Sequence, residues 1–504
     1  MLEDGFNRAL DRLWAWARWQ VGLISEDSAP QTKVGFRPSL ATGTLVLVAF
    51  AYQVVSGGLL LLYYQPSVYP TLTACGQALG TSSASPAAWC STYYIVHSVP
   101  MGAVLLTSHL YGAYVVIALL LVHLFRGFYV GSYKLPGRKF SWVAGTLLLL
   151  LTLAMGFTGY LLAYTQLSYN ATQVSITLVQ AFPGVGPSLA DLILGDGTAQ
   201  GLLSRMFALH VVLLPAAILL LVFLHKRSVL FPRMLVGAVK WGLLYIGTLL
   251  AVATLWLWSL PTYAGGTGGA GAVSTPAWFF LWVFKLVDFE GVTPEAVMVF
   301  IAVLVVLLLV LPFLDRSPSL RPRDRPVILF LGNTLVGGFV LLTAWGDLEP
   351  GVPASAGAVA WRLGPVVVVN ALVVAFFHLR SRRLAQASGS SRPEGSEVNA
   401  DASAKSSVDA QPVAASGPGR LAVTSARLAA AGLVGSLFLV PMGLLVPVLF
   451  LFSSFLVQLA DEARRPSGSP TGTRPSDSEQ WVFPCVGLVA VVGLLVASGA
   501  MLLV

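Results

Sequence analysis

Four of the six histidines stand inside long apolar stretches, where an ionisable side chain is expensive and usually functional. They form two sets, His109 with His123 (123 − 109 = 14) and His210 with His225 (225 − 210 = 15). On a helix, 14 residues return a side chain to within about 40° of its first direction and advance it by about 21 Å. Each stretch therefore presents two imidazoles on nearly one face, one near each membrane surface.

Two such helices facing each other would make two histidine pairs stacked across a bilayer, His109 with His210 on the outer side and His123 with His225 on the inner side. The 15-residue interval overshoots by about 60°, and Pro215 within it is expected to bend the helix and absorb part of the difference. Zinc prefers more than two protein ligands, with thiolate or carboxylate commonly among them. Axial ligation of haem iron needs two imidazoles about one porphyrin apart, which this spacing supplies. For any single histidine, a hydrogen-bonded packing role is the alternative.

Glycines repeat with the same interval on two other apolar stretches. Gly43 and Gly57 are 57 − 43 = 14 apart, and so are Gly145 and Gly159 (159 − 145 = 14). At the depth of each histidine pair there is thus one glycine on each of these stretches. A flat macrocycle at that depth would need the close backbone approach that glycine allows. Ordinary helix packing in a membrane is the other reading.

The composition decides what kind of elements hold these residues. Of 504 residues, 10% are charged and 56% hydrophobic, and the mean hydropathy is +0.78. A soluble chain carries about a quarter charged residues, so this composition predicts an all-α polytopic membrane protein. Eight spans are expected, as follows: 40–64, 100–125, 142–165, 206–225, 236–260, 294–314, 327–345 and 358–378.

Lys and Arg gather in every second loop. They cluster before the first span and in 126–139, 226–233, 316–325 and 380–383. The positive-inside rule then places the N-terminus in the cytoplasm. The expected location is a bacterial-type inner (cytoplasmic) membrane. The net charge of +8 is therefore topological and does not indicate nucleic-acid binding.

Five segments follow from this reading. Residues 1–37 carry an amphipathic surface helix, 38–232 form a four-helix core around the histidines, and 233–383 supply four further helices. The Ser-, Gly- and Pro-rich stretch 384–420 reads as a disordered cytoplasmic linker. Residues 421–504 add one to three spans, since the block 428–459 is either one kinked span or a tight hairpin.

Three motifs resemble the cytochrome b of quinol-oxidising bc-type complexes. The run HLYGAYVVIALLLVHLFRGFYVGSYKLPGRKFSW from His109 is similar to the family's first haem helix and following loop. GFTGYLLAYTQLS (156–168) resembles its outer quinol-site segment, and LSRMFALHVVLLP (203–215) the start of its second haem helix. The 15-residue interval is similar to the chloroplast-type branch. The final 120 or so residues have no counterpart in the family.

The resemblance implies two b-type haems, an outer quinol-oxidising site and an inner quinone-reducing site. It also implies a Rieske-type iron–sulfur protein, a c-type cytochrome, the quinone pool and a homodimer of complexes. Arg126 and Arg205 match family arginines near the haem propionates; interfacial anchoring is their alternative role.

The outer site departs from the family pattern. Its Pro-Glu-Trp-Tyr signature is here Pro276-Ala277-Trp278-Phe279, so the carboxylate and the phenol are both missing. Tyr164 stands where the family has tryptophan. Asp288 and Glu290 lie further along the chain as candidate substitute bases, or are simply solvated acids.

Two cysteine observations complete the expectations. The position at which chloroplast-type relatives attach an extra haem is Ala41, so no covalent third haem is expected. Cys75 and Cys90 share an outer loop and are expected to form a disulfide in an oxidising periplasm.

Three functions compete. The first is a cytochrome b subunit of a respiratory quinol:cytochrome c oxidoreductase, active with its partner subunits. The second is a non-bifurcating di-haem conduit linked to quinone in a non-standard respiratory complex. The third is a membrane scaffold or transporter with vestigial motifs, against which the lack of a broken-helix signature argues.

Overall fold

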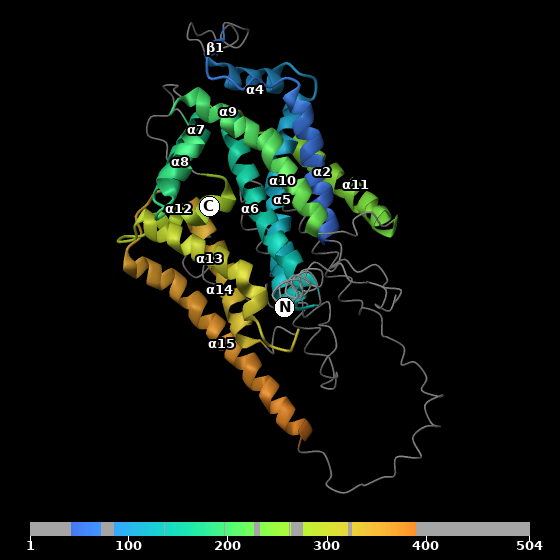
Figure 1. The fold of residues 1–504 in the computed structure, drawn as a ribbon, viewed down its shortest axis with the longest axis vertical. Helices are drawn as coiled ribbons and strands as arrows, with labels where there is room; N and C mark the ends of the chain where they lie inside the picture. Colours follow the sequence, from blue (N-terminus) through green and yellow to red (C-terminus); the bar gives the residue numbers. More distant parts are fainter. Residues whose placement is uncertain are drawn as a thin grey trace, which may run out of the picture. The chain divides into compact units, whose positions relative to one another are not determined.

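The computed structural model describes residues 42–71, 85–135, 137–195, 197–225, 232–261, 263, 276–320 and 325–389. Apart from a two-residue ladder, the regular elements in these ranges are helices, as the composition predicted (Figure 1). The expected surface helix in 1–37, Ala41, Cys75 and everything after residue 389 lie outside the described residues. Among the described residues, six helices are long and apolar enough to cross a membrane: Gly43–Leu61, Gly102–Val130, Arg138–Leu162, Ala199–His225, Pro294–Leu314 and Pro326–Leu348.

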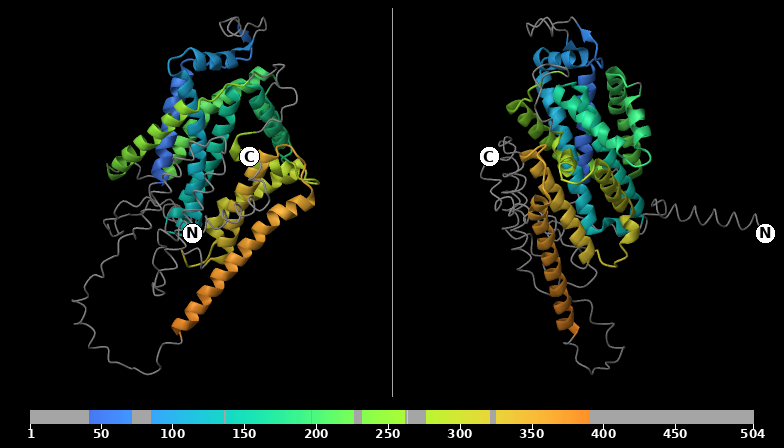
Figure 2. Two further views of the ribbon diagram at one scale, coloured as in Figure 1. Left: turned by 180° about the vertical axis from the view of Figure 1, so that it is seen from behind. Right: turned by 90° about the vertical axis from the view of Figure 1, so that its left-hand side faces the viewer.

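The expected first four spans form the core around the histidines. They are α2 (Thr42–Leu61), α5 (Gly102–Val130), α6 (Arg138–Leu162) and a composite span of α9 (Ala199–Ala208), η3 (Leu209–Leu213) and α10 (Leu214–His225). α2 packs on α5, α10 packs on α6, and α5 contacts α6, which brings the four spans side by side (Figures 1 and 2).

The turn between α5 and α6 is tight because glycines begin and end it. Gly131 caps α5 with φ 65°, and Gly137 precedes α6 with φ 70°. A left-handed backbone costs glycine nothing, whereas other residues lose energy there. The short helix η2 (Ser132–Lys134) lies between them.

Several short elements between the spans were not predicted from the sequence. They are β1 (Pro70–Thr71), β2 (Ser85–Pro86), α4 (Ala87–His97), α7 (Gln166–Gln180) and α8 (Gly186–Leu194). α4 lies across the end of α2 and α5 (Figure 1). It carries Cys90, which is disulfide-bonded; the expected partner, Cys75, lies outside the described residues. These helices are too short or too polar to show as spans.

Five helices follow the core: α11 (Pro232–Leu255), α12 (Trp278–Val287), α13 (Pro294–Leu314), α14 (Pro326–Leu348) and α15 (Ala356–Gly389). α11 and α15 take the places of the expected fifth and eighth spans, with shorter apolar helical stretches, Tyr245–Leu255 and Ala356–Leu372. α15 continues through residues 384–389, into the segment expected to be disordered. α12 is an additional short apolar helix on the loop before α13.

Two compact units divide the chain. The first comprises Met1–Arg316 with Phe339–Ala360, and the second Ser317–Gly338 with Trp361–Val504. The first therefore contains the four core spans together with α11, α12 and α13. All sites described below lie in the first unit.

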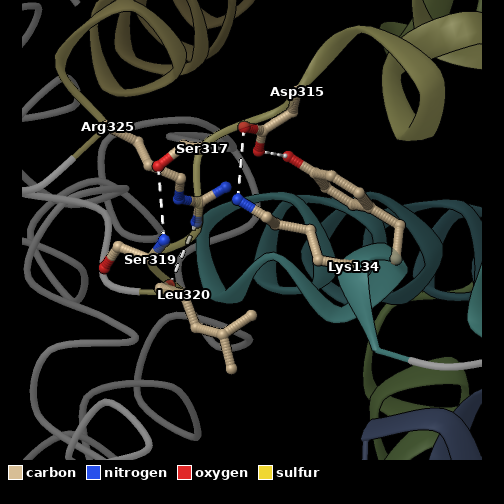
Figure 3. Close-up of polar contacts among 7 residues, drawn as sticks. Lys134, Asp315, Ser317, Ser319, Leu320 and Arg325 are labelled. Atoms are coloured by element: carbon tan, nitrogen blue, oxygen red, sulfur yellow. Dashed lines mark hydrogen bonds and ion pairs between the residues drawn. The ribbon is translucent and has the colours of Figure 1, made fainter. Parts of the chain in front are cut away.

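A buried ion pair joins the α5–α6 turn to the end of α13 in the first unit. Lys134 Nζ lies 3.2 Å from Asp315 Oδ1, and the side chains are 10% and 3% exposed (Figure 3). Tyr133 donates to the other carboxylate oxygen at 2.7 Å. Nearby, Trp142 Nε1 donates to the carbonyl of Leu308 at 2.6 Å. Figure 3 also draws the start of the second unit, where the Arg325 guanidinium donates to the Leu320 carbonyl at 3.2 Å.

Candidate functional site

The four intramembrane histidines lie in the two predicted pairs. The ring centres of His109 and His210 are 6.3 Å apart with planes at 80°, and those of His123 and His225 are 6.4 Å apart with planes at 70°. α5 contributes one ring to each pair, and the composite span of η3 and α10 contributes the other.

The extra residue between His210 and His225 is accommodated by a turn of π-helix. The sequence predicted a bend at Pro215 and not this turn. η3 spans Leu209–Leu213, and the N–H of Leu214 donates to the carbonyl of Leu209, five residues earlier. A π turn takes up one more residue than an α turn. Pro215 has no N–H and cannot make the α-type bond in the next position, which favours the wider turn here. The 15-residue interval therefore presents its two rings much as a 14-residue interval on a regular helix would.

Backbone carbonyls of α6 hold two of the rings. His210 Nδ1 lies 3.0 Å from the Met155 carbonyl, with Thr158 Oγ1 at 3.3 Å. His225 Nδ1 lies 2.7 Å from the Ser141 carbonyl. Since a carbonyl only accepts, the hydrogen sits on Nδ1 in both rings, and Nε2 keeps a lone pair for a metal.

A side chain holds the third ring. His109 Nδ1 lies 2.9 Å from Ser56 Oγ, which also lies 2.8 Å from the Tyr52 carbonyl. Ser56 gives its hydrogen to that carbonyl, so its oxygen accepts from Nδ1 of His109. This ring, too, has Nε2 available.

The spacing within each pair fits a single metal ion between the rings. A metal lies about 2 Å from each imidazole nitrogen and roughly 1 Å further from the ring centre, so two axial imidazoles have centres about 6 Å apart. Among the described residues, no group of three or more His, Cys, Asp or Glu gathers that could hold a metal. Two nitrogens and no further protein ligand fit a metal whose remaining positions come from a macrocycle, as in haem.

Each of the four predicted glycines lies against one imidazole. An added Cβ would come 3.2 Å from His123 Cε1 at Gly43, 3.1 Å from His109 Cε1 at Gly57 and 3.0 Å from His225 Cε1 at Gly145. At Gly159 it would overlap Cε1 of His210. The levels match the prediction, and the close approach is to the ring edges of the histidines.

The two predicted arginines lie one near each histidine pair along the chain. Arg126 follows His123 by 126 − 123 = 3 residues on α5, and Arg205 precedes His210 on α9. The Arg205 guanidinium lies over Gly195, whose φ is 66° and where a Cβ would overlap it. Gly195 thus makes room for this guanidinium.

The two segments predicted to form the outer quinol site meet in the structure. Pro276 and Ala277 lead into α12, whose first turn packs on the core. Phe279 lies edge-on to Tyr114 at 6.1 Å, and its ring tip would be 3.0 Å from a Cβ at Gly156. Phe280 lies 6.3 Å from Phe157. Trp278 faces away, toward Phe339 at 6.3 Å.

Tyr164 has an unusual backbone at the end of α6. Its φ is +46°, and the side chain is 6% exposed among residues of α6, α7, α8 and α9. The next residue, Thr165, pairs with Tyr263 and caps α7. Burial, with Tyr169 nearby, raises the pKa of Tyr164 to about 12. The phenol therefore stays protonated at neutral pH and can donate a hydrogen bond but not accept a proton.

The two candidate bases lie at the far end of α12. Eleven residues separate Ala277 from Asp288 (288 − 277 = 11), about 16 Å along a helix. Asp288 Oδ2 is paired with Lys285 Nζ at 3.3 Å, and Glu290 is exposed. Neither stands where the missing glutamate would.

Lys285 is a buried cation that the sequence analysis did not single out. Its side chain is fully buried, and besides Asp288 it donates to the carbonyls of Glu349 (2.9 Å) and Val352 (2.8 Å). It also lies 4.9 Å from the centre of the Trp345 ring. A lone lysine within the apolar run WFFLWVFKLV was the available signal.

Comparison with known proteins agrees with this geometry. Residues 114–233 match the family described as cytochrome b (N-terminal)/b6/petB, and residues 272–361 match cytochrome b (C-terminal)/b6/petD. A cytochrome bc complex cytochrome b subunit of Chlorobaculum thiosulfatiphilum is 32% identical over 330 residues, covering 60% of this chain and 72% of the relative. The chain belongs to the cytochrome b family.

Other relatives extend the comparison of this cytochrome b. Cytochrome b of Sulfolobus acidocaldarius is 34% identical over 387 residues, which cover 66% of this chain and 65% of the relative. A cytochrome b6 of Heliomicrobium gestii is 36% identical over 209 residues, covering 41% of this chain and 89% of the relative. A solved chain from a hyperthermophilic respiratory Complex III shares the fold, with a TM-score of 0.53 and 23% identity over 75% of this chain and 97% of the other.

Proposed function

We propose that this cytochrome b is the membrane subunit of a bc-type complex that oxidises quinol on the outer side, and that it holds two b-type haems. His109 and His210 would hold the outer haem iron, and His123 and His225 the inner one. The observation that carries the proposal is the pair geometry, with centres 6.3 and 6.4 Å apart. Bound haem would accept and release single electrons.

The residues around each pair orient the ligands and keep them dry. Met155, Ser141 and Ser56 lie within hydrogen-bond distance of Nδ1 of three rings, which would leave Nε2 of each for the iron. The four glycines leave space for the ring edges, and the apolar spans exclude water. Arg126 and Arg205 are proposed to pair with haem propionates, for which a guanidinium is well suited.

The outer quinol site is proposed where 156–168 meets Pro276–Phe280. Trp278 and Tyr164 border it, and Asp288 and Glu290 are retained only as outer-side acids beyond the site. Relatives from Geobacillus thermodenitrificans and Bacillus subtilis are named menaquinol:cytochrome c reductase cytochrome b subunits. These names support a quinol donor and a c-type cytochrome acceptor. The same proposal includes a Rieske-type partner, a homodimer of complexes and an inner quinone-reducing site. It also places the protein in a bacterial cytoplasmic membrane with its N-terminus in the cytoplasm.

Haem counting tests the ligand assignment. The purified chain is expected to contain two b haems per polypeptide, measured as the pyridine haemochromogen, and to titrate as two components. His123→Leu and His225→Leu should each remove the inner component. His97→Ala is the matched control, because His97 belongs to neither pair. It lies on α4, where its Nδ1 is hydrogen-bonded to the Tyr93 carbonyl of the same helix. A wild-type chain with fewer than two haems would contradict the proposal.

A second function, a non-bifurcating di-haem conduit, is favoured by one observation. Ala277 removes the carboxylate of the outer site, and Asp288 is already engaged by Lys285. Under this alternative, quinol turnover would persist in complexes from which the iron–sulfur protein has been removed. Turnover that stops on its removal and returns on its reconstitution would support bifurcation.

A further inference from the structure

His109 differs from His210 and His225 in what holds its ring. Backbone carbonyls of α6 hold the other two at 3.0 and 2.7 Å, with the Thr158 hydroxyl of the same helix 3.3 Å from His210. His109 is instead fixed by the hydroxyl of Ser56, which comes from α2. Ser56 is 1% exposed, so water does not compete for this bond. A hydrogen bond to the non-ligating nitrogen sets the ring's tautomer and its strength as a metal ligand.

The direction of the bond follows from the other contacts of Ser56. Its one hydrogen is directed to the carbonyl of Tyr52 (2.8 Å), one turn earlier on α2, with that of Gln53 at 3.3 Å. The oxygen therefore accepts from Nδ1 of His109. Gln53 also stands beside this ring: in the orientation that satisfies its amide, the oxygen accepts from the Ala113 N–H and the nitrogen donates to the His109 carbonyl at 2.9 Å. In that orientation the nitrogen also donates toward Nδ1 at 3.2 Å, a contact that requires Nδ1 to carry no hydrogen. With Nε2 bound to iron, Nδ1 carries the hydrogen, and Ser56 Oγ at 2.9 Å is then its acceptor.

We propose that Ser56 is a positioning residue that sets the reduction potential of the outer haem alone. This inference rests on the proposed function, since it assumes a haem between His109 and His210. By accepting from Nδ1–H, the hydroxyl increases the electron density that Nε2 can give to iron, which favours the oxidised state. Removal of the hydroxyl should therefore raise the potential of the outer haem.

The effect should be confined to one haem because Ser56 holds a ring of the outer pair, whereas the acceptor of His225 in the inner pair lies on α6. His225 takes its acceptor from Ser141, at the other end of α6, and Ser56 touches neither inner ring. Tyr52 offers a matched control on the same helix. Its phenol donates to Ser108 Oγ at 2.6 Å and makes no contact with His109, while its carbonyl, which Ser56 uses, is unaffected by substitution.

The test is a potentiometric titration of the b haems in the intact complex for wild type, Ser56→Ala, Ser56→Thr and Tyr52→Phe. In Ser56→Ala, one component should shift upward, with an about tenfold change in its reduction equilibrium, equivalent to about 59 mV for one electron. The other component should keep its potential. Ser56→Thr restores a hydroxyl and should restore the wild-type value, and Tyr52→Phe should titrate as wild type.

The outcomes separate this inference from the proposed function. Fewer than two b haems in the wild type would overturn both. Two haems whose potentials are unchanged in Ser56→Ala, or that shift together, would overturn the role of Ser56 and leave the di-haem assignment standing. Should Ser56→Ala lose the outer component, its return in Ser56→Thr would support the role, and its continued absence would refute it.

Discussion

The N–H of Leu214 donates to the carbonyl of Leu209 across a π turn that contains His210. A single extra residue is stored in that turn, so the helix on either side keeps a regular register. His210 and His225 consequently face α5 together although they are separated by one residue more than His109 and His123.

Deletion of Val212 should be tolerated by the histidine pairs. Removing one residue from the π turn converts it to an α turn and leaves the directions of both rings nearly unchanged. Two b components are therefore expected in the redox titration. Deletion of Leu220, in the regular part of α10, is the matched control; it rotates His225 by about 100° relative to His210 and should remove one component. Loss of a component in the Val212 deletion would contradict this interpretation. So would retention of both components in the Leu220 deletion.

Gly159→Ala should disturb the outer pair. The added methyl overlaps His210 Cε1. Because closely packed helices cannot move apart easily, the ring must move away from its acceptor, the Met155 carbonyl. We expect the outer b component to be lost or its haem content to fall several-fold. Gly58→Ala is the control, because a Cβ there meets no atom within 4 Å. Equal haem contents in the two variants would show that the glycine is not needed for clearance.

Lys285→Met should destabilise the protein around the end of α12. The substitution leaves the Asp288 carboxylate and the carbonyls of Glu349 and Val352 without their donor. Breaking such a buried arrangement lowers the free energy of unfolding by about 2–4 kcal/mol. This range already allows for the 19% exposure of Asp288, which weakens the ion pair. Equilibrium unfolding in mixed detergent measures it. Lys139→Met, which removes a cation lying 5.1 Å from the Phe313 ring centre, should cost under about 1 kcal/mol.

The Tyr164 phenol should make stability fall at high pH. Its pKa is raised to about 12 in the fold, from about 10 in the unfolded chain. The folded state therefore favours the protonated phenol: its contribution is complete below pH 10 and is lost as the pH rises toward 12. Tyr164→Phe should reduce the loss of thermal stability over this range. Tyr69→Phe, at a 67% exposed position, should leave it unchanged, and identical profiles for all three proteins would refute the assignment.

The pairing of the histidines and the level of each glycine could be predicted because membrane helices turn residue spacing into direction and depth. His109, His123 and Gly57 lie in long apolar runs, where backbone hydrogen bonds must close within the helix. The register follows from the interval alone. The membrane-spanning, all-helical fold was predictable for the same reason.

The contacts that hold the site could not be predicted in the same way. The acceptors for His210 and His225 are carbonyls, which every residue carries, so no residue type marks them. The pairing of Asp288 with Lys285 depends on the turn after α12 and its contacts with residues 349–354. The π turn arises from a missing N–H at Pro215, and the expected bend was a reasonable but less specific reading of the same proline. α4, α7 and α8 were missed because they are too short to be recognised as membrane spans.

The hydrogen-bond acceptors of the histidine rings differ in whether an amino-acid substitution can remove them. No codon change removes the carbonyl of Met155 or Ser141, so His210 and His225 keep their hydrogen bonds under almost any drift of the sequence. Ser56 can lose its hydroxyl through one amino-acid replacement. Within this group of rings, His109 is thus the place where natural selection can adjust the site without rebuilding a helix.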